Sequence, residues 1–181
     1  PVSPFAHTPL AMWMARHRPD SYAQARWFLS AWDFVSMQLC EQPAASALAY
    51  FQPFPEKEVE ASRLPHKMFP AVVKAGSPIA GLTAAAAHAT GLPKGLPIVA
   101  GAHDGIATFI GSGLVKPGRA ADVNGTSGGL ALCWTGPIER PGIFSEGWLH
   151  PGEYIAGGAM AALGKCLDWV REAVAGSDLT H

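Results

Sequence analysis

The hydrophobic pattern along the chain predicts helices first and short strands later. From residue 9 to residue 50, apolar side chains recur at helical spacing, which indicates helical structure over this stretch. Asp20 and Ser21 are residue types that cap a short helix within it. Further on, Pro55 precedes a charged run that suits the first turn of a surface helix, which we expect to end near Arg63.

The middle of the chain gives a clear sequence of local signals. Thr83 can cap a helix over residues 84–89, and Gly91 can close it. Residues 96–100 are apolar without polar alternation, which is typical of a strand covered on both faces in a parallel or mixed sheet. Asp104 follows this run, so the sequence places an acid where open α/β sheets usually bind ligands.

A helix and a hairpin are expected after Asp104. Apolar residues at helical spacing predict a helix that stops at Gly111. Two short apolar strands, 120–123 and 130–134, then flank a tip of small residues, which predicts a hairpin with a wide loop. A third strand is expected at residues 154–156.

The glycine pair after this third strand is expected at a junction. We expect Gly157 and Gly158 to lead directly into an apolar helix that carries Met160, Leu163 and Leu167. An anion at such a helix start would be stabilised by the amides of the first turn.

Composition limits the classes of protein. With 49% hydrophobic and 15% charged residues, the chain can bury a sizeable core. A formal net charge of −1 without a run of Lys or Arg gives no footprint for nucleic acid or an acidic membrane. No stretch reaches the ~20 apolar residues of a membrane span, and the first residues lack the layout of an export signal, so we expect a cytoplasmic protein.

The cysteines and tryptophans suggest packing more than chemistry. Cys40, Cys133 and Cys166 are odd in number, distant in sequence and set among apolar neighbours, so we expect reduced core thiols. The six tryptophans have no interleaved basic residues, which favours core or sheet packing over a stacking platform. His103 has no third ligand at a recognisable spacing, so no metal site is expected.

Asp104 allows two interpretations, which are compatible with one another. It can act as a general base at the mouth of a cleft, because glycines at 101 and 105 let a substrate approach the backbone. It can equally be a structural cap for the helix that follows.

The small-residue tip is similarly ambiguous. Gly125, Thr126 and Ser127, with the glycines at 128 and 129, can offer N–H groups and hydroxyls to a phosphate. The alternative is a hairpin turn that needs glycine for its backbone conformation. Ser127 is offset by one position from the G-x-S-x-G elbow, which argues against a hydrolase.

The order of these motifs is more informative than any one of them. The succession is Thr-x6-Thr-Gly-Leu-Pro over 83–93, Gly-Leu-Pro-Ile-Val-Ala-Gly-Ala-His-Asp-Gly over 95–105, Gly-Thr-Ser over 125–127, Ile-Ala-Gly-Gly-Ala over 155–159 and Leu-Asp-Trp-Val over 167–170. This succession resembles the FGGY family of carbohydrate kinases, and the likeness extends upstream through residues 26–34 and Ser46.

The resemblance implies an α/β protein with the actin-like ATPase, ribonuclease H-like fold, in parts of two domains. Residues 1–112 would be the C-terminal part of the first domain and residues 113–181 the N-terminal part of the second. The implied reaction is transfer of a phosphoryl group from ATP, with Mg²⁺, to a hydroxyl of a sugar, ketose or polyol.

The resemblance also assigns roles to residues and partners. Asp104 matches the catalytic base. Gly125, Thr126 and Ser127 match a phosphate loop, and Gly157 and Gly158 fall where the family approaches the nucleotide phosphates. The partners would be the sugar or polyol, ATP and the remaining segments of the kinase, with self-association left open.

The chain departs from the family pattern by omission. It lacks the opening strand with its acid and first phosphate loop, the early sugar-binding residues and the late adenosine site, so we expect an incomplete piece that is inactive alone. Two other classes remain open: a non-catalytic remnant that binds sugar or nucleotide, and an actin-type ATPase with water as its nucleophile. The identity of the sugar is also open, because Gly105 has no side chain to select it.

Overall fold

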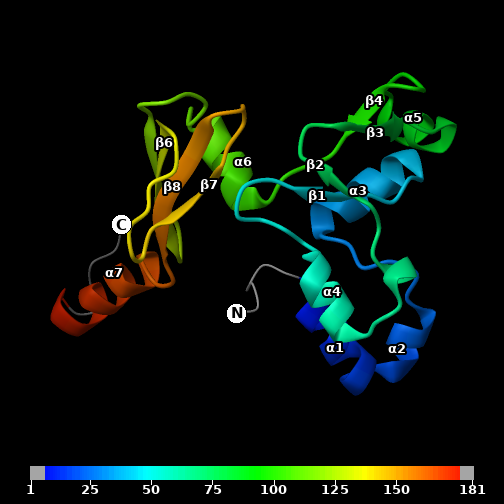
Figure 1. The fold of residues 1–181 in the computed structure, drawn as a ribbon, viewed down its shortest axis with the longest axis horizontal. Helices are drawn as coiled ribbons and strands as arrows, with labels where there is room; N and C mark the ends of the chain where they lie inside the picture. The colour runs from blue at the N-terminus through cyan, green and yellow to red at the C-terminus, as the bar shows by residue number, and fades with distance from the viewer. Residues whose placement is uncertain (1–6, 176–181) are drawn as a thin grey trace. The chain divides into compact units, whose positions relative to one another are not determined.

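The computed structural model describes residues 7–175, and the chain divides into two compact units. Unit 1 spans residues 1–103 and unit 2 spans residues 104–181. Figure 1 shows the helices and short strands of the first unit and the larger sheet of the second. Asp104, which the sequence placed at the end of a first domain, therefore begins the second compact unit.

Unit 1 combines helices with two pairs of very short strands. Its helices are α1 (Thr8–His17), α2 (Pro19–Gln24), α3 (Ala31–Cys40), α4 (Glu56–Ser62), the 3₁₀ turn η1 (His66–Met68) and α5 (Ala84–Thr90). Its strands are β1 (Ala45–Ala47) and β2 (Val72–Lys74), which pair in parallel, and β3 (Pro78–Gly81) and β4 (Pro97–Val99), which pair antiparallel. None of these four strands was expected except β4.

A core cluster in unit 1 joins the first helices to β1 and α4. Its buried members are Ala11, Phe28, Ala45, Phe54, Val59 and Met68. Half-buried apolar side chains, Tyr22 and Phe69 among them, pack around it. Burial of such side chains contributes about 1.5–3 kcal/mol each for the larger ones, so this cluster fixes α1 and α4 against one another.

The helical expectation for residues 9–50 is correct only in part. Residues 25–30 are not helical, and after Cys40 the chain forms a three-residue strand. The apolar residues at 44 and 45 are buried beside β2, so their hydrophobicity reports a covered strand and not a helix face. Helix α4, in contrast, ends as expected, because Arg63 caps it in the left-handed conformation with a φ of 58°.

Helix α5 forms as the local signals predict. The Thr83 hydroxyl accepts a hydrogen bond from the Ala86 N–H at 3.2 Å. Gly91 ends the helix with a φ of 72°, a conformation that glycine adopts without strain.

Strand β4 forms as expected, but the prediction that it is covered on both faces in a parallel or mixed sheet is wrong. The strand lies in a two-stranded antiparallel sheet, and Val99 is 49% exposed, so β4 is not covered on both faces. A pair of strands has no inner position, so an apolar run alone does not reveal how many neighbours a strand has.

Unit 2 is a helix followed by a four-stranded antiparallel sheet. Helix α6 (Asp104–Gly111) precedes strands β5 (Ala120–Asn124), β6 (Gly128–Thr135), β7 (Phe144–Gly147) and β8 (Glu153–Met160), which lie in the order β5-β6-β8-β7. The chain continues into α7 (Gly164–Val170) and the π-helical segment η2 (Arg171–Ala175). The hairpin of β5 and β6 was expected, whereas β7 was not.

Trp148 is buried in unit 2 and links two of its segments by a hydrogen bond. Trp148 is 4% exposed, and its indole N–H donates to the carbonyl of Leu114 at 2.7 Å. Ile106, Leu114 and Ile155 are fully buried with it. This arrangement ties the end of α6 to the strand region around β7.

The position of the glycine pair in unit 2 corrects the expected strand-to-helix junction. Gly157 and Gly158 lie within β8, opposite Ala131 and Leu130 of β6, and Met160 is still part of the strand. The helix begins only at Gly164. A glycine pair also serves close strand packing, and the sequence does not separate this use from a turn.

Several side chains expected in a core lie at the surface. Trp13, Trp134 and Trp169 are 50%, 47% and 65% exposed. Cys40 and Cys133 are buried free thiols as expected, but Cys166 is exposed. Helix α7 presents most of its length to solvent, so its apolar positions do not report burial. Within residues 7–175, no helix is long and apolar enough to cross a membrane.

Candidate active site

Asp104 is the first residue of α6. Its Oδ1 atom accepts a hydrogen bond from the Gly105 N–H at 2.7 Å, and its carbonyl oxygen accepts one from the Thr108 hydroxyl at 2.8 Å. The carboxylate is exposed, and a negative charge in the first turn of a helix is favourable. Asp104 is thus the first residue of the helix itself, and this hydrogen bond to its Oδ1 comes from the adjacent N–H and not from the N–H two or three residues further on that a capping side chain binds. The carboxylate is accessible, and its role as a base stays a prediction.

Helix α6 packs directly on the hairpin. Ile106 and Phe109 are its buried residues, and the ring of Phe109 lies 3.4 Å from the place where a Cβ on Gly129 would stand. This packing belongs to unit 2 alone. The helix that begins with Asp104 and the hairpin that carries the small-residue tip are thus parts of one packed unit.

The tip of the hairpin is narrower than the sequence indicated. Asn124 pairs with Gly128, so the turn consists of Gly125, Thr126 and Ser127. Gly128 and Gly129 belong to β6. The Gly125 N–H donates to the Ser127 carbonyl at 2.8 Å, which closes the turn.

The tip is fastened to the start of α7. The carbonyl of Thr126 accepts from the Leu163 N–H at 3.0 Å, and that of Gly125 accepts from the Gly164 N–H at 2.9 Å. The side chains of Thr126 and Ser127 are exposed, and no hydrogen bond within the described part of the chain engages their hydroxyls. The turn is therefore held by its carbonyl oxygens while its hydroxyls face solvent.

The space around Gly125 is open, and packing does not require glycine at this position. Its φ lies outside the left-handed region, and a Cβ placed there would meet only the Ser127 carbonyl, at 3.6 Å. An ordinary residue would fit. The open space at a turn with exposed hydroxyls is what an approaching anion needs, so the residues present fit a phosphate group.

The two glycines of β8 differ from one another. A Cβ on Gly157 would collide with the carbonyl oxygen of Leu130, so close strand packing explains this glycine. At Gly158 the nearest atom is the Gly142 carbonyl oxygen at 4.0 Å, so packing does not explain the second. Gly158 lies opposite Leu130, two positions after Gly128, the first residue of β6. A ligand role at either glycine stays a prediction.

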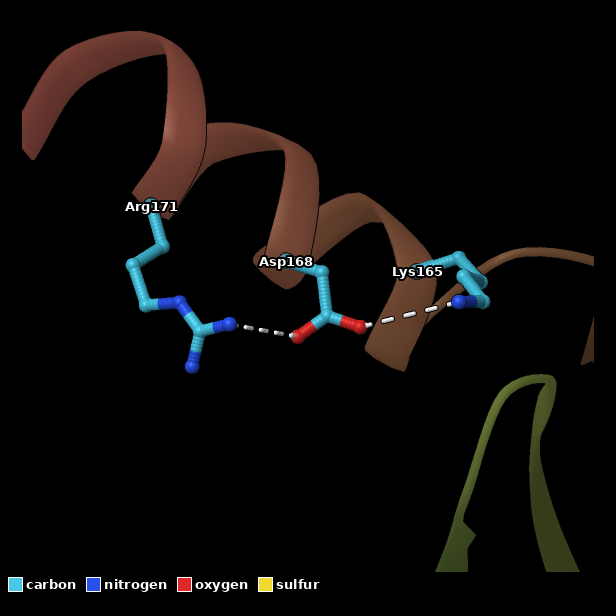
Figure 2. Close-up of polar contacts among 3 residues, drawn as sticks. All are labelled: Lys165, Asp168 and Arg171. Atoms are coloured by element: carbon cyan, nitrogen blue, oxygen red, sulfur yellow. Dashed lines mark ion pairs between the residues drawn. The ribbon is translucent and has the colours of Figure 1, made fainter. Parts of the chain in front are cut away.

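Charged side chains follow the tip along α7. Figure 2 shows Asp168 between Lys165 and Arg171, with carboxylate-to-nitrogen distances of 4.0 and 3.7 Å. All three side chains are at least one third exposed, so these pairs add little to stability.

His103 contacts aromatic rings in unit 1. Its ring stacks on Phe51 at a centroid distance of 5.4 Å and meets the edge of Trp32 at 5.8 Å and of Tyr50 at 6.2 Å. In the described residues no group of three or more His, Cys, Asp and Glu could hold a metal ion. His103 thus lies in an aromatic cluster, which the sequence did not indicate.

A buried polar network is connected to this aromatic cluster through Trp32. The indole N–H of Trp32 donates to the Ser46 hydroxyl at 2.6 Å, and this hydroxyl donates to Oδ1 of Asp33 at 2.8 Å. Asp33 and Ser46 are each 1% exposed. Burial raises the pKa of Asp33, and hydrogen bonds from Ser46 and Ser30 oppose that shift. The one signal in the sequence was an acid set within an otherwise apolar helix.

The chain belongs to the FGGY family of carbohydrate kinases. The family model for the N-terminal domain matches residues 1–111. Among curated relatives, an autoinducer-2 kinase of Yersinia enterocolitica is 27% identical over 176 residues, covering 91% of this chain and 33% of its own. An L-fuculokinase of Salmonella typhi is 30% identical over 125 residues, covering 66% of this chain and 26% of its own.

Solved structures share the fold. A xylulose kinase from Rhodospirillum rubrum matches with a TM-score of 0.78 and 24% identity, over 96% of this chain and 38% of that one. A Plasmodium falciparum glycerol kinase with ADP matches with a TM-score of 0.67 and 12% identity, over 91% and 36%. The expected actin-like ATPase, ribonuclease H-like α/β fold is confirmed.

The chain spans about a third of the length of the relatives it matches. The family match ends at residue 111, whereas the compact units divide between residues 103 and 104. The assignment of residues 1–112 and 113–181 to two kinase domains stays a prediction.

Proposed function

We propose that the whole protein carrying this chain transfers the γ-phosphoryl group of ATP, accompanied by Mg²⁺, to a hydroxyl of a sugar, ketose or polyol. The observation that carries the proposal is the arrangement in unit 2: an accessible carboxylate at the start of α6, which packs on a hairpin whose tip is open to an anion. The relatives support this class, since they are named as kinases of autoinducer-2 and L-fuculose.

Each residue has a defined part in the proposed reaction. Asp104 accepts the proton of the attacking hydroxyl as the bond to phosphorus forms. The turn of Gly125, Thr126 and Ser127 binds phosphate oxygens through the hydroxyls of Thr126 and Ser127 and through main-chain N–H groups other than that of Gly125, which donates to the Ser127 carbonyl. Gly157 and Gly158 of the neighbouring strand β8 approach the nucleotide phosphates. Mg²⁺ would accompany the nucleotide and neutralise phosphate charge. No residue of this chain is assigned to it.

The base in phosphoryl transfer need not be strong. The transition state of phosphoryl transfer is loose, so proton removal from the nucleophile is late and most of the rate enhancement comes from positioning and charge stabilisation. Positioning alone can be worth about 7–11 kcal/mol of the barrier. We therefore propose that a piece holding only part of the cleft is inactive alone. A cytoplasmic location and self-association of the whole protein are further proposals.

The decisive experiment is Asp104→Asn in the whole protein. The amide keeps the size of the side chain but cannot accept the proton, so we expect turnover with a panel of sugars and polyols to be nearly abolished while ATP binding stays measurable. Asp20→Asn is the matched control, because Asp20 is also exposed in the first turn of a helix, α2.

The same assays separate the alternatives. Retained sugar phosphorylation by Asp104→Asn would defeat the assignment of the base. ATP hydrolysis that does not depend on a sugar would indicate an actin-type ATPase. Absence of ATP consumption by the unaltered protein with every sugar or polyol would indicate a binding remnant.

A further inference from the structure

We propose that Lys165 of α7 binds the phosphate groups of the nucleotide at the hairpin tip of unit 2, and that Asp168 pairs with this lysine when no nucleotide is bound. The inference rests on the proposed function, and it adds a cation that the sequence motifs did not include. All the residues that carry it belong to unit 2.

The first step is the charge of the tip. None of the residues from Asn124 to Gly128 is charged. The side-chain amide of Asn124 donates to the carboxylate of Asp122 at 2.9 Å, so the charge that β5 brings next to the tip is negative. Hydroxyls and main-chain N–H groups bind phosphate oxygens, but they bring no charge that offsets the charge of the phosphates. A phosphate group at this tip is therefore favoured by a cation from another element.

The second step is the close packing of the start of α7 against the tip. A Cβ on Gly164 would collide with the Gly125 carbonyl oxygen, so the two segments touch through their backbones. The Leu163 side chain packs on the same hairpin, where a Cβ on Gly128 would stand 2.5 Å from its Cδ2 atom. Lys165 follows Gly164 directly, so its Cα lies about 3.8 Å from that of a residue in contact with the tip.

The third step is the weak hold on Lys165. Its Nζ atom lies 4.0 Å from Oδ2 of Asp168, and the side chain is 70% exposed. An ion pair of this length and exposure adds little to stability and is screened by salt. A phosphate oxygen offers the ammonium a shorter, charge-assisted hydrogen bond, and the flexible stem of lysine lets the ammonium turn towards it.

The fourth step is the second partner of Asp168. Figure 2 shows the carboxylate between two cations, and its Oδ1 atom lies 3.7 Å from the guanidinium of Arg171. When Lys165 turns to a phosphate group, Asp168 keeps this second cation, so the exchange leaves no unpaired carboxylate next to the nucleotide. Asp168 therefore holds Lys165 near the tip without opposing its release.

The test measures the affinity of the whole protein for ATP in the presence of Mg²⁺, by titration calorimetry. Lys165→Gln keeps a long polar side chain but removes the charge, and we expect the affinity to fall by about tenfold or more. Lys165→Arg keeps a charge and should recover most of that loss. Lys116→Gln, at an exposed lysine of unit 2 in the turn before β5, is the matched control and should bind ATP as the unaltered protein does.

Asp168→Asn tests the pairing. Without the carboxylate the ammonium is released, so we expect ATP to bind severalfold more tightly. In a Lys165→Gln background the same substitution should have a much smaller effect, because no ammonium remains to be released, and the four proteins form a double-mutant cycle. Equal effects in the two backgrounds would show that Asp168 acts on ATP by its own charge, which would overturn the pairing.

The outcomes are distinguishable. The role of Lys165 is overturned if Lys165→Gln binds ATP as Lys116→Gln does, or if Lys165→Arg binds no better than Lys165→Gln. An unaltered protein that binds no ATP would refute the proposed function, and this inference with it. Full turnover of Asp104→Asn together with a weakened ATP affinity of Lys165→Gln would refute the proposed base while the role of Lys165 stands.

Discussion

The carboxylate of Asp33 in α3 accepts two kinds of hydrogen bond from Ser46 in β1, one from the main-chain N–H at 3.2 Å and one from the hydroxyl at 2.8 Å. Both residues are buried. A buried carboxylate without donors would be strongly unfavourable, so this pair of residues, 13 positions apart in sequence, fixes the distance between α3 and β1.

Ser46→Ala should lower the stability of the whole protein. The change removes a donor to Asp33 and leaves the Trp32 indole N–H without its acceptor, which we expect to cost about 1–3 kcal/mol of unfolding free energy. Thermal unfolding measures it. Ser36→Ala in α3 is the control, because the Ser36 hydroxyl donates to the Trp32 carbonyl within its own helix. A loss as large in this variant would contradict the account.

Substitution by alanine should destabilise the fold at Gly157 of β8 but not at Gly158. Gly157→Ala places a methyl group against the Leu130 carbonyl oxygen, so the β6–β8 ladder must shift, and we expect a loss of several degrees in the thermal midpoint. Gly158→Ala meets nothing closer than 4.0 Å and should fold normally. Equal stability of the two variants would refute the steric explanation for Gly157.

The cap of α5 offers a local test. Thr83→Ala removes the hydroxyl that accepts the Ala86 N–H, and we expect a loss of about 1 kcal/mol. Thr90→Ala, at the exposed last position of the same helix, should change stability by less than about 0.5 kcal/mol. Hydrogen exchange of the α5 amides provides the measurement, and faster exchange in Thr90→Ala than in Thr83→Ala would be inconsistent with capping.

These contrasts explain how much of the fold the sequence predicts. Helix α5 and the hairpin were predictable because their signals, the Thr83 cap and the glycine-rich tip, are local. Strands β1 and β2 were not, since three residues carry too little periodicity and their pairing is set by distant residues. The β8 glycines misled because strand packing and a turn require the same residue type.

The candidate site divides in the same way. Asp104 and the tip could be predicted as candidate site residues because an acid before a helix and a run of small residues are visible in one stretch of sequence, and their roles stay predictions. The link from Asp33 through Ser46 and Trp32 to His103 was not found, because its members belong to α3, β1 and the segment after β4. Such a network exists only after the chain has folded.

His7 predicts a dependence of stability on pH. Burial lowers the pKa of His7 from 6.5, and its ring lies 2.7 Å from the Ser30 hydroxyl. Between 6.5 and the lowered value the unfolded chain binds a proton that the folded chain does not, so stability is full above this window and falls as the pH drops through it.

The measurement compares thermal midpoints at about pH 8 and about pH 5.5. We expect the unaltered protein to lose more stability on acidification than His7→Gln, whose side chain does not titrate. His66→Gln is the control at an exposed histidine and should behave as the unaltered protein does. An identical acid response in His7→Gln would show that His7 is not the responsible group.

Gly125→Ala separates ligand binding from folding at the tip. The structure leaves room for a Cβ at this position, and the backbone conformation suits any residue, so we expect the thermal midpoint to stay unchanged. If phosphate oxygens occupy that space, the methyl group displaces them and weakens the hydrogen bonds from the turn. Loss of one or two such bonds to a charged group, at about 1.5–3 kcal/mol each, corresponds to at least a tenfold weaker affinity for ATP.

Titration calorimetry with ATP on the whole protein measures the change. Gly147→Ala, at another glycine of unit 2 with open space around it, should leave both affinity and stability unaltered. An ATP affinity of Gly125→Ala equal to that of Gly147→Ala would exclude the turn as the phosphate site, because packing within the fold does not require glycine at position 125.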